Sequence, residues 1–346
     1  MAANHKTAPA ALGLDVGTSR ICLARNAGGE FQYKTQLNAF VTIPFSKMTE
    51  SVLKKSDIPH KINGSEIVVH GNESDRFADL LNIETRRTMN RGVLNSSEPD
   101  SLAMIRQIIA SMLEPKPPLE SKSPPESEPP GNKLCFTIPA APLGAEDNLT
   151  YHEATLKQVI TELGYQVRSI NEGLAVVYAE LEESNYTGIG ISCGGGLCNA
   201  CLAYLSVPVL SFSMAKAGDY IDQCAASMTG ERANRIRILK EEDFHLNGFF
   251  TGKIHQVLGV YYDEMILSLV QAMKEAFHGA RNKPKIGRPI PVVLSGGTAL
   301  PAGFRDRFEK ILKEQEFPIP ISEIRMAKDP LHTSAKGALV AALADM

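Results

Sequence analysis

The sequence contains no tryptophan, and aromatic residues make up only 6% of it. No apolar run approaches the roughly 20 residues of a membrane-spanning helix. Basic residues are not in excess, because 36 Lys and Arg stand against 39 Asp and Glu, a net charge of -3. No basic run is long enough to hold nucleic acid or an anionic membrane, so neither is expected as a partner. The N-terminus lacks the charged start and apolar middle of a signal peptide, which predicts a cytoplasmic protein.

Cysteine is also scarce, with six residues scattered over 346 positions, too few for a disulfide framework. Cys193, Cys198 and Cys201 lie close together but form no paired CxxC knuckles, and no histidine is near them in sequence. Strand alternation would place Cys198 and Cys201 on opposite faces. Buried thiols are therefore the better interpretation than a metal site.

What the chain does contain is ample apolar material, 43% of its residues, in short β-like runs that alternate with helical stretches. This alternation predicts an α/β architecture, and the length favours one large two-lobed unit or two domains. The segment 114–132, EPKPPLESKSPPESEPPGN, is rich in Pro, Ser and Glu and has almost nothing to bury. Because strand material resumes at once, it predicts an insertion that could bind a partner, not a domain boundary.

Two segments share one plan of a strand, a glycine-bearing tight turn, a second strand and a third. They are GLDVGTSRICLARNAGGEFQYK near the start and GIGISCGGGLCNACLAYLSVPVLSFS in the middle. Laid over each other, Asp15 falls on Ser192 and Gly17 falls on Gly194. Such a repeat suggests two related lobes with a ligand between their turns.

The chemistry of these turns favours phosphate. Glycines let successive backbone N–H groups approach an anion, and the hydroxyls of Thr18 and Ser19 add donors. An acidic residue at the strand end, Asp15, could organise Mg²⁺ through its water shell. Each turn taken alone is equally well explained as an ordinary β-hairpin.

Six motifs then occur in an order that resembles the actin, 70-kDa heat-shock chaperone and sugar kinase superfamily. They are LGLDVGTS, VRSINEGLAVVYAEL, GIGISCGGG, KAGDYID, VVLSGGTALPAGF and DPLHTSAKGALVAAL. The resemblance covers about residues 12–344 and is strongest to bacterial actins (MreB-, ParM- or MamK-like), through AGDYID, MNRGVL and the compact size.

The resemblance implies an actin-like two-lobed α/β fold, made of duplicated ribonuclease H-like domains with a nucleotide cleft between them. Lobe I is expected over 1–171 and lobe II over 172–346, with a reduced accessory subdomain at about 239–252. The C-terminal helix is expected to pack back on lobe I.

The resemblance also implies roles for single residues. Asp15 would hold Mg²⁺ through water, and Glu172 would polarise the attacking water, although the helix macrodipole alone also explains a glutamate there. ATP or ADP would be bound by the phosphate and adenosine motifs, namely Gly17, Thr18, Ser19, Ser192, Gly194, Gly195, Gly196, Gly218, Asp219, Gly296, Gly297 and Thr298. Glu231 and Asn234 would face the ribose and base, unless they simply lie on a solvated helix face.

Two positions depart from the family pattern. Ser192 stands where the phosphate-2 motif has an aspartate, and Gly173 stands where connect-1 has a proline. Losing one such electrostatic group can lower a rate by roughly 10² to 10³. We therefore expect ATP binding with weak hydrolysis at most.

Three functions remain open. The first is a nucleotide-dependent filament protein that self-associates. The second is a non-polymerising nucleotide-binding scaffold or pseudo-ATPase, which Ser192 makes credible. The third is a small-molecule kinase of the same fold, for which the sequence shows no sugar pocket. The motifs do not decide between ATP and GTP.

Overall fold

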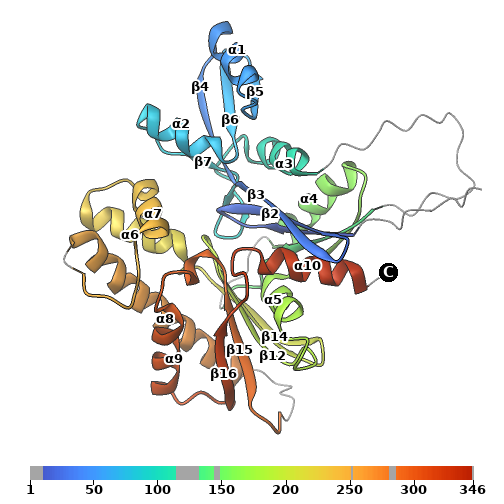
Figure 1. Cartoon of the computed structure of the whole chain (residues 1–346), viewed down its shortest axis with the longest axis vertical. Helices are drawn as coiled ribbons and strands as arrows, with labels where there is room; N and C mark the ends of the chain where they lie inside the picture. The colour runs from blue at the N-terminus through green and yellow to red at the C-terminus, as the bar shows by residue number, and fades with distance from the viewer. Residues whose placement is uncertain (1–10, 114–131, 144–148, 251, 280–285, 345–346) are drawn as a thin grey trace, which may run out of the picture.

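The computed structural model describes residues 11–113, 132–143, 149–250, 252–279 and 286–344. The predicted insertion at 114–132 lies outside these residues, apart from Asn132. The described chain forms two lobes, each built around a five-stranded sheet (Figure 1).

The sheet of the first lobe has the order β11-β10-β1-β2-β3. Its strands are β1 (Ala11–Val16), β2 (Arg20–Ala27), β3 (Glu30–Leu37), β10 (Lys133–Ile138) and β11 (Gln166–Asn171). β1, β2 and β3 form an antiparallel meander, whereas β10 runs parallel to β1 and β11 runs parallel to β10. Alternate side chains of β2 enter different cores, because Ile21 and Leu23 pack in one cluster and Cys22 and Ala24 in another.

The sheet of the second lobe repeats this plan in the order β14-β13-β12-β15-β16. Its strands are β12 (Gly188–Cys193), β13 (Cys198–Tyr204), β14 (Val207–Met214), β15 (Ile290–Ser295) and β16 (Ile321–Met326). The first three are again antiparallel, and β15 and β16 again follow in parallel. The internal repeat seen in the sequence is thus a repeat of strand order and direction, which places the two glycine turns at equivalent sheet positions.

Two central helices, α5 (Glu172–Glu180) and α10 (Thr333–Ala344), pack on each other between the sheets (Figure 1). α10 lies against β1 and α5 lies against β12 and β13. Glycine makes the crossing possible: a Cβ on Gly337 would lie 1.8 Å from the Ala175 carbonyl oxygen. The predicted lobe boundary at 171/172 falls where β11 passes into α5, and it stays a prediction.

Helices cover the outer faces of both sheets. On the first lobe these are α3 (Ser101–Met112) and α4 (Leu149–Glu162), and on the second α8 (Lys253–Gly279) and α9 (Phe304–Glu314). α6 (Gly218–Thr229) packs on α8, α7 (Ala233–Glu242) packs on α6, and the 3-10 turn η1 (Gly297–Ala299) follows β15. Residues 243–250 form no helix or strand.

A small extra sheet projects from the first lobe (Figure 1). It contains β4 (Ala39–Pro44), β5 (His60–Asn63), β6 (Glu66–His70) and β7 (Arg86–Arg87), with α1 (Lys47–Lys55) and α2 (Glu73–Leu81). The short hairpin of β8 (Met89–Asn90) and β9 (Val93–Leu94) leads back to the first lobe. Within the described residues, no helix is long and apolar enough to cross a membrane.

Candidate functional site

Two glycine turns face each other where the lobes meet. In the first, the N–H of Gly17 donates to the Arg20 carbonyl at 3.0 Å, and in the second the N–H of Gly194 donates to Leu197 at 2.9 Å. A Cβ on Gly195 would lie only 2.1 Å from the Ser19 hydroxyl oxygen. Glycine is therefore required for the turns to approach this closely.

The carbonyl groups of the second turn are occupied by neighbouring elements. The Gly194 carbonyl accepts from the Gly218 N–H at 3.1 Å and from the Thr298 hydroxyl at 2.7 Å, and the Gly195 carbonyl accepts from the Asp219 N–H at 2.7 Å. The start of α6 and the turn after β15 thus fix this turn in place. The N–H groups of Gly195 and Gly196 are left for another partner.

Four N–H groups of the two turns have no hydrogen-bond partner among the residues that the structure describes. They belong to Thr18, Ser19, Gly195 and Gly196. Successive backbone N–H groups in a turn that are not used within the protein can bind an anion such as phosphate.

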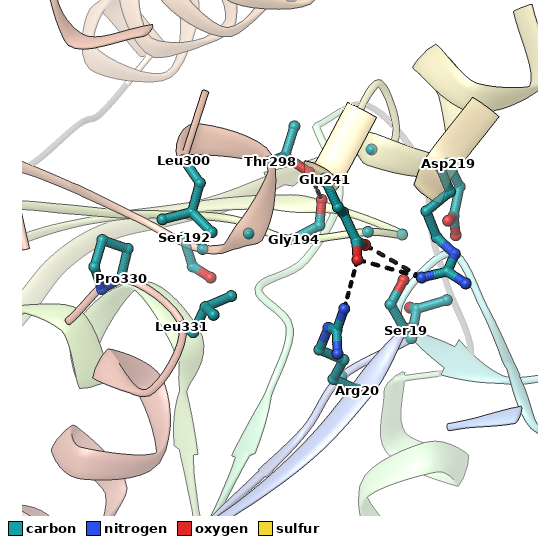
Figure 2. A pocket seen from close by; sticks show the side chains of 18 of the residues that line it. Ser19, Arg20, Ser192, Gly194, Asp219, Glu241, Thr298, Leu300, Pro330 and Leu331 are labelled. Atoms are coloured by element: carbon teal, nitrogen blue, oxygen red, sulfur yellow. Dashed lines mark hydrogen bonds and ion pairs between the residues drawn. The ribbon is translucent and has the colours of Figure 1, made fainter. Parts of the chain in front are cut away.

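A cavity of about 410 Å³ opens beside the turns, within the size range of small-ligand sites. Figure 2 shows Ser19 and Arg20 of the first lobe opposite Gly194, Asp219 and Thr298 of the second. The structure brings fourteen predicted site residues to its wall: Asp15, Gly17, Thr18, Ser19, Glu172, Ser192, Gly194, Gly195, Gly196, Gly218, Asp219, Gly296, Gly297 and Thr298.

Glu231 and Asn234 do not line this cavity. Glu231 forms an ion pair with Arg235 at 3.5 Å, and buried Asn234 donates to Asp75 of α2 at 3.5 Å. The reason is their position along the chain. Glu231 precedes α7, which begins at Ala233, and Asn234 lies in its first turn, whereas the part of the helix that faces the cavity comes later. The α7 residues that do line it are Arg237, Lys240 and Glu241.

Two carboxyl groups lie at the centre of the site. The Thr137 hydroxyl donates to Asp15 at 2.5 Å, while withdrawal from water raises the pKa of Asp15 to about 6. Withdrawal from water and the nearby charge of Asp15 raise the pKa of Glu172 to about 8, against hydrogen bonds from Ser192 and Asn199 that lower it. The negative charge of each carboxylate thus disfavours ionisation of the other, and a cation close to both would lower their pKa values.

This pair of carboxyl groups should make stability depend on pH. Each has a folded-state pKa above its unfolded value, so the folded chain holds protons that the unfolded chain releases. We expect the free energy of unfolding, measured with urea in a chelator, to fall as pH rises from about 4 to about 8, by at most about 1.4 kcal/mol per pH unit for each proton. Glu172→Gln should flatten this slope. Equal slopes in the two proteins would contradict the assignment.

Asn199 is a site residue that the sequence analysis missed. It is fully buried on β13, directly opposite Ser192 in the strand register. Its side-chain amide donates to Glu172 Oε2 at 2.8 Å, and its side-chain oxygen accepts from the Ala140 N–H at 2.9 Å. It therefore orients Glu172 and ties it to the loop after β10. The only available signal was its position opposite Ser192 across the hairpin.

Charged side chains close the site between the lobes. Arg20 forms an ion pair with Glu241 at 2.6 Å across the cavity mouth (Figure 2). Arg87 reaches Asp219 at 2.7 Å. Both pairs join the first lobe to the second, so they favour a closed arrangement of the lobes.

A second set of interlobe contacts lies above the cavity, where α2 meets α7. Arg237 contacts Asp75 at 2.5 Å, and Arg232 donates to the Ile83 carbonyl at 3.2 Å. Arg237 is almost completely buried and also lines the cavity. One side chain thus connects the cavity wall with the small extra sheet.

The donor set fits a phosphate ligand with a hydrated cation. No group of three or more His, Cys, Asp or Glu residues that could hold a metal occurs in the described parts of the chain. The described residues therefore do not offer a set of three or more side chains that would bind a metal directly. Mg²⁺ usually keeps several waters and needs only one or two carboxylates, which matches Asp15 with Glu172 nearby.

This chain matches one protein family by sequence and several solved structures by fold. A family model named volactin matches residues 10–342. No curated protein matches the chain by sequence. Among solved structures, the MamK double helical filament aligns with a TM-score of 0.68 and 16% identity, covering 97% of this chain and 99% of that one.

Two further structures show the same fold. MreB 5 of Spiroplasma citri, bound to AMPPNP, aligns with a TM-score of 0.62 and 13% identity over 96% of this chain and 95% of that one. The ethanolamine utilization protein EutJ from Carboxydothermus hydrogenoformans aligns at 0.56 and 15% over 97% and 91%. These likenesses confirm the predicted actin-like, two-lobed α/β fold. The chain, matched over nearly its whole length, belongs to the volactin family and has the actin-like fold.

Proposed function

We propose that this protein binds ATP with Mg²⁺ between its lobes and assembles into filaments in a nucleotide-dependent way. The observation that carries the proposal is the pair of facing turns beside the carboxyl groups of Asp15 and Glu172; four N–H groups of these turns have no partner within the described part of the chain. AMPPNP is bound in the similar MreB 5 structure, and the similar MamK structure is a filament. Both likenesses support the proposal.

Different parts of the cavity wall would hold the phosphates and the nucleoside of a bound nucleotide. The phosphates would lie on the N–H groups of Gly195 and Gly196 and those of the first turn, and Asp15 would hold Mg²⁺ through water. When bound, Mg²⁺ would neutralise phosphate charge. The sugar and base would lie farther along the wall, beside the loop that starts at Gly296 and beside Lys240 of α7.

Hydrolysis is expected to be slow. Glu172 is the group placed to take a proton from water; its pKa of about 8 belongs to the site without a cation, and Mg²⁺ bound nearby would lower it. Ser192 supplies a hydroxyl in place of a second carboxylate at the end of β12. Binding can survive this change, because backbone N–H groups do not depend on it.

A non-polymerising nucleotide-binding scaffold is the second candidate. Ser192 favours it, because slow hydrolysis would leave the lobes closed on the nucleotide. The interlobe pairs Arg20–Glu241 and Arg87–Asp219 would then hold one lobe arrangement for a partner to bind. Sedimentation and electron microscopy of the purified full chain with Mg²⁺ and ATP separate the two candidates, since only the first predicts ordered filaments.

Gly195→Ala tests the binding site itself. Its Cβ would lie 2.1 Å from the Ser19 oxygen and 3.0 Å from the Ser19 Cβ, so Ser19 or the turn must shift and the phosphate-facing surface changes shape. We expect ATP affinity, measured by calorimetry, to fall at least about 10-fold, the equivalent of about 1.4 kcal/mol. Gly252→Ala is the matched control, because its Cβ meets nothing nearer than 3.8 Å and the residue does not line the cavity. Equal affinities of the two variants would count against the proposed site.

A further inference from the structure

Two exposed apolar surfaces lie toward opposite ends of the molecule. One is on α1, at the top of Figure 1, and the other is the tip of the hairpin formed by β13 and β14, in its lower half. β4 starts beside the first glycine turn, where the Asn38 N–H donates to the Ser19 carbonyl, and it leads outward to α1. β12 ends at the second turn, and its first residue, Gly188, pairs with Ala203 beside the hairpin tip. The cavity therefore lies between the two surfaces.

The hairpin tip is strained and firmly braced. Leu205 and Ser206 form the turn with φ of +49° and +69°, the left-handed region that suits Gly or Asn. The Leu205 N–H donates to the Thr187 hydroxyl at 3.0 Å. The Ser206 N–H donates to the Tyr186 carbonyl at 3.2 Å, and the Ser206 carbonyl accepts from the Tyr178 hydroxyl at 3.0 Å. The turn nevertheless leaves Leu205 47% exposed, and a strained turn that presents a leucine to solvent indicates a contact surface.

The surroundings of this tip are acidic. Tyr204 and Val207 flank the turn and are exposed, and the loop that braces it carries exposed Glu182 and Glu183. Neither glutamate has an ion-pair partner among the residues that the structure describes. The sequence of this loop and turn, EESNYT and YLSV, contains no lysine or arginine. We call Glu182, Glu183, Tyr204, Leu205 and Val207 the tip surface.

The surface at the other end is apolar and basic. Met48, Val52 and Lys55 lie at i, i+4 and i+7 on α1, so they share one face, and Met48 is 80% exposed. Lys47 lies beside them, and neither Lys47 nor Lys55 has an ion-pair partner within the described part of the chain. Residues 45–62 hold four lysines against two acidic residues. We call Lys47, Met48, Val52 and Lys55 the α1 surface.

The two surfaces complement each other in charge, and both offer exposed apolar side chains. Two α1 surfaces would repel each other, as would two tip surfaces, which disfavours a symmetric dimer. A contact between unlike surfaces at opposite ends repeats from one copy to the next and extends as a filament. We infer that the tip surface of one molecule docks on the α1 surface of a second copy, head to tail. The inference rests on the proposed function and names the contact that would build its filaments.

This contact would also connect assembly to the cavity. The α1 surface belongs to the first lobe and the tip surface to the second, so the arrangement of the lobes sets how the two surfaces are placed. The pairs Arg20–Glu241 and Arg87–Asp219 join the lobes beside the cavity. A ligand that changes the lobe arrangement would therefore change the fit between neighbouring copies.

Charge reversal tests the pairing of the two surfaces. One variant carries Lys47→Glu with Lys55→Glu, and the other carries Glu182→Lys with Glu183→Lys. With Mg²⁺ and ATP, each variant alone should need at least about a 10-fold higher concentration than wild type to sediment. An equal mixture should sediment near the wild-type concentration, because each reversed surface then meets its complement. Lys157→Glu, at an exposed lysine of α4 outside both surfaces, is the control and should sediment like wild type.

Leu205→Asn separates a contact role from a structural one. Asparagine suits the left-handed conformation, so the variant should unfold at a temperature no lower than wild type. It also removes the exposed leucine from the contact, so sedimentation should need about a 10-fold higher concentration. Sedimentation of this variant at the wild-type concentration would overturn the inference.

The outcomes distinguish this inference from the function on which it rests. If wild type forms filaments and both charge-reversed variants form them equally well, or if their mixture never recovers, the inference alone is overturned. If wild type forms no filaments with Mg²⁺ and ATP, the proposed assembly fails and the inference with it. Vesicles of phosphatidylglycerol and phosphatidylcholine give a further readout. Vesicle binding by wild type that Lys47→Glu with Lys55→Glu abolishes, while filaments persist, would assign the α1 surface to a membrane and overturn the inference.

Discussion

Replacing Lys240 with methionine is expected to lower the free energy of unfolding by about 3–5 kcal/mol at neutral pH. Lys240 Nζ lies 2.7 Å from Asp222 Oδ1, and the side chain of each residue is at most 7% exposed. Lys240 also donates to the Gly218 carbonyl at the start of α6. Without the ammonium group, Asp222 would be a buried carboxylate with no counter-charge, and α6 and α7 would lose the ion pair between them.

The loss should shrink in acid. Burial already raises the pKa of Asp222, while Lys240 lowers it, so removing Lys240 raises it further. A raised folded-state pKa makes the variant regain stability as pH falls and Asp222 takes up a proton. Urea unfolding at neutral and mildly acidic pH measures this difference.

Lys216→Met is the matched control for this experiment. Lys216 pairs with Glu264 at a similar distance, 2.6 Å, but both side chains are 40% exposed. Such an exposed pair contributes at most about 1 kcal/mol. Replacing both Lys240 and Asp222 with apolar residues should recover much of the stability lost in Lys240→Met. If Lys240→Met and Lys216→Met lose similar amounts of stability, burial of the Lys240–Asp222 pair does not make its loss more destabilising.

Ser192→Asp is expected to accelerate hydrolysis of Mg²⁺-ATP by about 10² to 10³. The new carboxylate would lie near the end of β12, beside Glu172. Asp15 lines the same cavity. The new carboxylate would help to order the water around Mg²⁺ and the attacking water. Phosphate release at saturating ATP measures the rate, and Ser192→Asn is the control of similar size without charge.

The same substitution should make stability depend on Mg²⁺. Asp15 and Glu172 already have raised pKa values, and a third acidic group beside them would raise their repulsion further. We expect Ser192→Asp to be less stable than wild type in chelator and to regain the difference with Mg²⁺ and nucleotide. Brisk wild-type hydrolysis that the substitution leaves unchanged would defeat this account of Ser192.

Local sequence signals predicted the elements that carry the two turns. Strand alternation around Gly17 and Gly194, and the repeat that aligns Asp15 with Ser192, were enough to expect two equivalent lobes. Other elements had weaker signals. β5 has one partly buried residue among three exposed ones, and β16 has no fully buried residue, so neither shows a clear apolar pattern. β5 of the extra sheet and β16, the edge strand of the second lobe, were therefore missed.

The wall of the site was predicted only in part, and for a physical reason. Turn residues such as Gly194 can be located because glycine is needed where backbones approach, and that need appears in the sequence. A residue on a helix meets a ligand only through the register and packing of the whole helix. The sequence therefore pointed to Glu231 and Asn234, whereas the residues of α7 (Ala233–Glu242) that line the cavity are Arg237, Lys240 and Glu241.

Local patterns were enough to predict the α/β class, the repeated strand–turn–strand plan and the residues of the two turns, because these depend on local backbone needs and on short-period burial. The contact of Asn199 with Glu172 and that of Arg237 with Asp75 of α2 follow instead from the way distant elements pack in the folded chain. Each of these contacts joins residues at least 20 positions apart or depends on what several elements leave open between them, and no local pattern encodes such a distance.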